Sequence, residues 1–174
     1  SESVDHAVFS HDIVIAQGWL DRVDGLESAR AAAILAAVLY HNRRDLPTGL
    51  EPLTLACAQT VRDADKLDIF RVLEERVRTT DWRRDTQAFW NLQTDAPPSA
   101  EVVSAIEARR PVDYQWIRSL ADFVLIQVGW MISGLAYATS RRLCRERKHL
   151  AFRREFLHLL TDDPAVDRIC DLVC

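Results

Sequence analysis

Apolar residues recur at helical spacing along most of this chain, and no stretch alternates Val, Ile or Thr with polar residues as a half-buried strand does. Gly and Pro, the residues that most often interrupt helices, number only 5 and 6. Together these observations predict an all-α fold. A chain of 174 residues is also long enough to bury a sizeable core within one domain.

Helices are expected wherever the apolar spacing is sustained between turn residues. The expected helices cover residues 7–20, 27–41, 53–64, 99–110, 114–140 and 141–160, with a short last helix after Pro164. Residues 67–77 are expected to form either a separate helix or the continuation of 53–64. Ser99 follows Pro97 and Pro98 and is the expected N-cap of its helix. An irregular stretch over residues 79–98 separates the first four helices from the others.

The distribution of charge favours neither nucleic acid nor a membrane as a partner. Net charge is −4, and the arginines of the basic segment 141–160 accompany an apolar stripe, which is typical of a solvated helix face. The uncharged stretch Phe123–Ser140 contains the polar residues Gln127 and Ser133. We therefore expect a buried central helix there, or a homo-oligomer interface over Phe123–Ala138.

The four cysteines are scattered and form no CxxC pair, so a zinc site is not expected. We interpret all of them as free thiols in a reducing cytoplasm: Cys57, Cys144, Cys170 and Cys174. Six aromatic residues could stack on the base of a nucleotide, although a role in the core is the stronger expectation. These six are Trp82, Phe89, Trp90, Tyr114, Trp116 and Trp130.

The segment from Arg62 to Ile69 packs three aspartates, an arginine and a lysine into one stretch of a predicted helix. Carboxylates are ligands for Mg²⁺, Mn²⁺ and Fe, and neighbouring cations can hold a phosphate. A solvated helix face with i,i+3 pairs such as Asp63–Lys66 has the same composition. This segment by itself leaves the two interpretations open.

His41 favours the metal-binding interpretation. It closes a very apolar predicted helix, where a histidine most often compensates the helix dipole. Here, however, a second helix with the aspartate cluster follows. Two antiparallel helices could bring His41 and Asp65 to one point, and histidine with carboxylate suits a catalytic transition metal.

The sequences AAVLYHNRRDLP (36–47) and RDADKLDIFRV (62–72) resemble the HD-domain superfamily of metal-dependent phosphohydrolases. The opening SVDHA (3–7) agrees with this resemblance, which is good over residues 1–80 and loose beyond, at Val128–Ile132 for example. The resemblance implies an HD-domain-like helical bundle with a C-terminal helical extension. Residues 1–80 would form the partial phosphohydrolase core, and residues 81–174 the extension packed on that core.

Carried over position by position, the resemblance implies that His6, His41 and Asp65 are metal ligands. It places Lys66 and Arg62 where they could contact a substrate phosphate. Arg43 and Arg44 are further phosphate-binding candidates because they lie beside His41, although a surface role is equally compatible with them. The implied cofactor is a divalent metal ion (Mn, Fe, Mg, Ni, Co or Zn). The implied substrate is a small phosphorylated molecule, with a nucleotide as the first expectation. The implied reaction is hydrolysis of its phosphomonoester or phosphodiester by metal-activated water.

The chain departs from the superfamily at its start, because the first histidine and the His-Asp pair that precede DHA in the family are not in this sequence. We expect that the chain is a fragment or that an upstream stretch is absent from it. His11-Asp12 does not replace the pair, since His11 follows His6 too closely and lies in an ordinary amphipathic helix. The alternative function is a catalytically inactive helical module for ligand binding or dimerisation.

Overall fold

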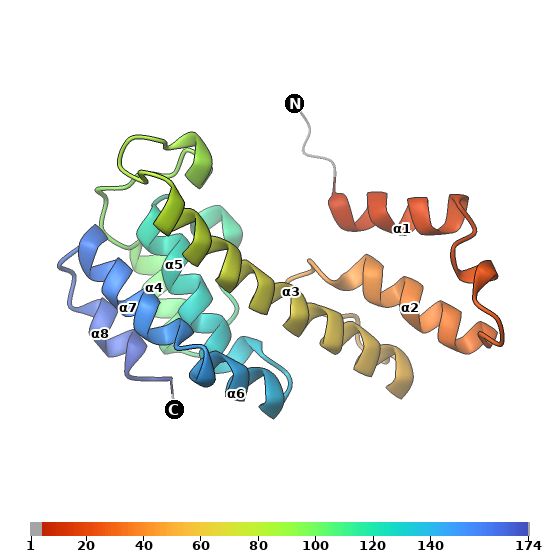
Figure 1. Ribbon diagram of the computed structural model, residues 1–174. Coiled ribbons are helices and arrows are strands. Elements are labelled where there is room, and N and C mark those ends of the chain that lie inside the picture. Colours follow the sequence, from red (N-terminus) through yellow and green to blue (C-terminus); the bar gives the residue numbers. More distant parts are fainter. Residues whose placement is uncertain (1–4, 174) are drawn as a thin grey trace. The chain divides into compact units, whose positions relative to one another are not determined.

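The computed structural model describes residues 5–173, and Figure 1 shows its helices. The predicted all-α class is confirmed: within the described residues there is no β-strand, only an isolated bridge between Gln93 and Ser119. The helices are α1 (His6–Ala16), α2 (Ser28–Tyr40), α3 (Pro52–Thr79), α4 (Ala100–Glu107), α5 (Leu120–Gly129), α6 (Ala138–Glu146), α7 (His149–Leu160) and α8 (Ala165–Cys170). None of these helices has both the length and the apolar character needed to cross a membrane.

The chain divides into two compact units, with the division inside α3. Unit 1 extends from Ser1 to Asp65, and unit 2 extends from Lys66 to Cys174. The resemblance implies a division of the chain into residues 1–80 and 81–174. The backbone contacts instead divide it between Asp65 and Lys66. Each unit is described by itself below.

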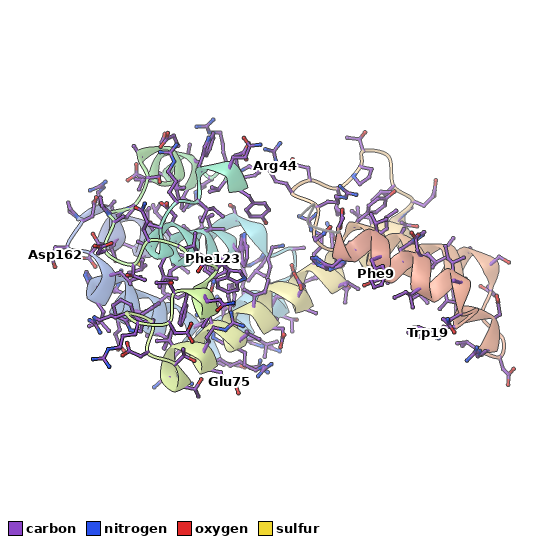
Figure 2. The ribbon with its side chains drawn as sticks, turned by 90° about the horizontal axis from the view of Figure 1, so that it is seen from above. Phe9, Trp19, Arg44, Glu75, Phe123 and Asp162 are labelled. Atoms are coloured by element: carbon purple, nitrogen blue, oxygen red, sulfur yellow. The ribbon has the colours of Figure 1, made fainter. Side chains whose placement is uncertain are left out.

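Unit 1 is built from α1, α2 and the first part of α3. Asp5 caps α1 by accepting a hydrogen bond from the backbone N–H of Ala7, and α1 then packs against α2. The fully buried apolar side chains of this unit are small: Ala7, Ala33, Ala37 and Ala58. Larger apolar side chains are exposed, and Figure 2 shows Phe9 and Trp19 along α1 and the turn that follows it.

Unit 2 is arranged around α5, which packs against α4, α7 and α8. Ser119 and Asp122 form a reciprocal capping box that begins α5. The Asp122 carboxylate also accepts hydrogen bonds from the backbone N–H and the hydroxyl of Ser99, so one side chain joins the starts of α4 and α5. The buried interior contains large residues, among them Phe89, Leu120, Leu125, Phe156 and Leu157.

The segments 53–64 and 67–77 form the single helix α3, the second of the two expected alternatives, because no Gly or Pro follows Pro52 within it. Two other predicted helices are divided in the structure. The predicted helix 114–140 breaks on both sides of α5. Asp113 caps a 3₁₀ turn (η3, Tyr114–Trp116) ahead of α5, and a π-helical turn (η4, Trp130–Gly134) follows α5 before the backbone becomes extended at Leu135.

The basic segment 141–160 is also two helices and not one. Lys148, with φ +56°, separates α6 from α7. A lysine in the left-handed region is uncommon, and it changes the direction of the chain between the two helices. The prediction of Ser99 as the N-cap residue of its helix is confirmed, although its hydroxyl bonds to Asp122 and does not cap α4.

The predicted burial of the Phe123–Ser140 stretch is confirmed for most of α5, where Val124, Leu125 and Val128 are fully enclosed. Trp82 and Phe89 lie in the core, as expected for most of the aromatic residues. Trp116 and Trp130 pack against the core, whereas Trp90 and Tyr114 are exposed. Cys57, Cys144 and Cys170 are free thiols, and Cys174 lies outside the described residues.

Candidate functional site

The packing of α1 against α2 in unit 1 brings two histidines together. His6 is the first residue of α1, and His41 directly follows α2. Their Nε2 atoms lie 3.0 Å apart, and their ring planes meet at 61°. Two side chains separated by 35 positions in the sequence therefore point the same ring nitrogen at each other.

The orientation of His41 is fixed by the end of its own helix. Its Nδ1 lies 2.7 Å from the carbonyl oxygen of Val38, a contact that assigns the proton to Nδ1. The Nε2 atom of His41 then carries the lone pair that faces His6. Metal-binding histidines are commonly oriented in this way, with the second ring nitrogen donating to a carbonyl oxygen.

The separation of the histidine pair fits two ligands of one metal ion. Two nitrogen ligands about 2.1 Å from a metal and about 90° apart are separated by about 3.0 Å. The Nε2 atoms of His6 and His41 have that separation. Without a metal, the same separation suits an N–H···N hydrogen bond from His6 to His41. The pair therefore fits two corners of a metal site.

Asp5 connects the two segments that hold the histidines. Its carboxylate accepts a 2.8 Å hydrogen bond from the Asn42 side chain and lies 3.3 Å from the guanidinium of Arg43. The hydrogen bond from Asn42, with help from the backbone of α1 and from Arg43, outweighs desolvation and lowers the pKa of Asp5. Asp5 is thus ionised at neutral pH, with partners on both sides of the pair.

Asp65, the predicted carboxylate ligand, lies on α3 in unit 1 and is partly buried. The structure does not bring it into a set with the histidines, because no group of three or more His, Cys, Asp or Glu residues among residues 5–173 is arranged to hold a metal ion. Its neighbour Asp63 is only 3% exposed. Arg62 joins α3 to the loop after His41 through a 3.0 Å hydrogen bond to the carbonyl oxygen of Arg44.

The two cations predicted to contact phosphate have different surroundings. Arg43 is about half exposed and pairs with Asp5 beside the histidines. Lys66 is the first residue of unit 2 and is partly buried. His11 lies outside the pair, as expected, and its Nδ1 is 3.1 Å from Asp12. Asp68 pairs with Arg71 on the surface of α3.

A buried polar cluster in unit 2 was not anticipated from the sequence. Arg153, assigned with its segment to a solvated face, is fully buried, so that assignment is wrong. Its guanidinium donates to Glu74 (2.9 Å), to Gln127 (2.7 and 3.0 Å) and to the carbonyl oxygens of Phe70 and His149. These contacts occupy all of its N–H donors, which offsets the cost of removing the charge from water.

Glu74 completes this cluster. His149 Nδ1 lies 2.5 Å from the same Glu74 oxygen that Arg153 contacts. Burial lowers the pKa of Arg153 to about 10 although Glu74 opposes the shift. Burial would raise the pKa of Glu74, but the hydrogen bonds from His149 and Arg153 hold it below its usual range. One signal was available, since Arg153 shares the spacing of the apolar residues Leu150, Phe156 and Leu157.

No family model, curated protein or solved structure matches this chain. The candidate site therefore depends on its own geometry, in which a histidine pair oriented by a backbone carbonyl lies beside an ionised carboxylate and an arginine. Chemically, this arrangement offers two nitrogen ligands to a metal ion and a cation to an anionic ligand.

Proposed function

We propose that this protein is an HD-type metal-dependent phosphohydrolase whose centre includes His6, His41 and Asp65. The observation that carries the proposal is the pair of facing Nε2 atoms, 3.0 Å apart, with His41 held in the tautomer that a metal requires. The resemblance of residues 36–47 and 62–72 to the superfamily also supports it. The helical fold is compatible with the proposal.

His6 and His41 would supply the neutral nitrogen ligands. Asp65, which this structure does not bring into a set with them, is the carboxylate ligand that the resemblance implies. When bound, a divalent metal lowers the pKa of a water molecule into the range in which it attacks a phosphate ester near neutral pH. Arg43, two residues after His41 in the chain, is the candidate for neutralising the phosphoryl oxygens. Lys66 is a second cation only by the resemblance. A nucleotide is the first substrate class to test.

The test is the metal content of the protein purified without added metal or chelator, measured by inductively coupled plasma mass spectrometry on samples of known intact mass. The wild-type chain is expected to retain Fe, Mn, Mg, Ni, Co or Zn at near-stoichiometric levels. His41→Ala and Asp65→Ala are expected to lose it with little change in helix content. His11→Ala, in the same helix as His6, is the matched control and is expected to retain it.

Two results would overturn this assignment. Loss of metal from His11→Ala with retention by Asp65→Ala would show that the ligands are wrong. A wild-type chain that holds no metal would favour the inactive ligand-binding or dimerisation module, which is then tested by its oligomeric state. Where metal is retained, release of inorganic phosphate from nucleotides and simple phosphate esters tests the reaction itself.

A further inference from the structure

The side chain of Asp5 contacts both segments of the histidine pair. It precedes His6 and caps α1 through the N–H of Ala7, at 3.0 Å. The same carboxylate reaches the two residues that follow His41, namely Asn42 at 2.8 Å and Arg43 at 3.3 Å. The start of α1 and the loop after α2 are therefore fastened together directly beside the two imidazole rings.

Besides facing each other, the two histidines differ in how their own helices hold them. His41 is oriented by Val38, which belongs to the helix that His41 ends. His6 lies in the first turn of α1 and is exposed. The buried residues of α1 and α2 are small (Ala7, Ala33 and Ala37), so their burial removes little apolar area from water. The contacts of Asp5 with Asn42 and Arg43 restrain the start of α1 against the loop after His41.

We propose that Asp5 is the positioning residue of this site: it sets the separation and mutual orientation of His6 and His41 by holding Asn42 and Arg43. It is not itself a ligand. The link to metal binding rests on the proposed function, whereas the effect on the geometry of the two histidines does not. Partners of this kind, one step removed from the ligands, typically change metal affinity by about 10- to 100-fold.

The variant Asp5→Ser separates positioning from helix capping. Serine caps a helix about as well as aspartate, but its short side chain does not extend to Asn42 and Arg43. Asp5→Asn keeps an acceptor oxygen for Asn42 and the cap, and loses only the charge that faces Arg43. Asp45→Ser is the matched control, because Asp45 is an acidic residue of the same loop that pairs with Arg44 instead.

Two measurements on the full chain test the proposal. The first, without metal, is the nuclear Overhauser effect between the ring protons of His6 and His41. The second is titration with Cu²⁺ alone, in which the nitrogen hyperfine pattern of the electron paramagnetic resonance spectrum counts bound imidazoles. Asp5→Ser is expected to lose the ring contact, to bind Cu²⁺ at least tenfold more weakly and to retain one imidazole. Asp5→Asn is expected to fall between Asp5→Ser and wild type, and Asp45→Ser to match wild type.

A wild-type ring contact and affinity in Asp5→Ser would overturn the inference. If the wild-type protein shows the ring contact but binds Cu²⁺ through no imidazole pair, the proposed function fails and the ring contact in Asp5→Ser still decides the role of Asp5. If Asp5→Ser loses helix content, Asn42→Ala replaces it, since this change removes a partner of Asp5 and leaves the α1 cap intact. Retention of the ring contact in Asn42→Ala would count against the proposal.

Discussion

The two units of this molecule bury very different side chains. Within the described residues of unit 1, the fully buried apolar side chains are all alanines, and the large apolar residues Phe9, Ile15 and Trp19 are at least half exposed. Unit 2 buries several phenylalanines and leucines, and it also buries a charged arginine, Arg153. The candidate site lies in unit 1, with the smaller buried side chains.

This difference indicates where the stability of the chain resides. Burial stabilises a fold roughly in proportion to the apolar area removed from water, so an alanine contributes much less than a leucine or a phenylalanine. We infer that unit 2 provides most of the free energy of unfolding and that unit 1 opens more easily. Binding sites are commonly found in the less stable part of a protein, because ligand entry requires local opening.

The largest effect is expected from Arg153→Met in unit 2. Methionine fills similar space but leaves the Glu74 carboxylate buried without the guanidinium at 2.9 Å. The loss in free energy of unfolding is expected to be about 4 kcal/mol, as for other buried ion pairs that lose one partner. Urea denaturation measures it. The control Arg71→Met removes an exposed arginine from α3 and is expected to leave stability unchanged; a small loss in Arg153→Met would mean that this cluster does not stabilise unit 2.

A matched pair of leucines compares the two units directly. Leu157 is fully buried in unit 2, whereas Leu53 in unit 1 is 46% exposed, and both are helical. Leu157→Ala is expected to lower the free energy of unfolding by about 3 kcal/mol, through lost transfer energy and a cavity. Leu53→Ala is expected to change it by less than about 0.5 kcal/mol. Similar losses from both variants, measured by thermal and urea denaturation, would contradict the contrast between the units.

The sequence predicts the helical class because periodic apolar spacing is a local property that survives in the fold. It predicts the ends of the helices poorly, because the spacing of apolar residues reflects which side chains are buried and not the backbone dihedral angles. The capping box of Ser119 and Asp122 was readable in the predicted helix 114–140, whereas the left-handed Lys148 has no such signal. Helix boundaries therefore depend on capping contacts and on single residues with unusual backbone angles, which the apolar spacing does not reveal.

The candidate site was predictable to the extent that short motifs mark it. The DHA and YHN motifs predict His6 and His41, and the structure places these two side chains together. The same DHA contains Asp5, but no local pattern indicates its role, because its partners Asn42 and Arg43 lie 37 and 38 positions away. The burial of Arg153 likewise depends on Glu74, 79 positions earlier. Such contacts form only once the helices have packed, so no local sequence pattern predicts them.

Two histidines, one in each unit, are expected to separate stability from binding. His149 is 2% exposed, contacts Glu74 at 2.5 Å and packs against Phe70. His149→Ala is expected to lower the free energy of unfolding by about 2 kcal/mol and to leave metal content unchanged. His41→Ala is expected to lose the metal and to leave the free energy of unfolding nearly unchanged. Parallel denaturation and metal analysis of both variants measure this, and a loss of metal from His149→Ala would link the cluster to the candidate site.

The smallest expected effect is an acid-dependent loss of stability through Glu74. Hydrogen bonds from His149 and Arg153 keep its pKa in the folded protein below the usual glutamate value of 4.5. A carboxylate with a lowered pKa stabilises the fold fully above the unfolded pKa, and this contribution is lost as the pH falls through the folded pKa. The urea midpoint should therefore decline as the pH falls below 4.5 in the wild-type protein.

Glu74→Gln is expected to be less stable at neutral pH, because Arg153 then lacks its buried counter-charge, and to show a shallower decline on acidification. Its matched control is Glu75→Gln, which neutralises the next residue of α3, an exposed carboxylate that pairs with Arg71. Exposed pairs contribute little, so Glu75→Gln should retain the wild-type acid dependence. An equal decline in the wild-type protein and in Glu74→Gln would place the acid sensitivity outside unit 2's cluster.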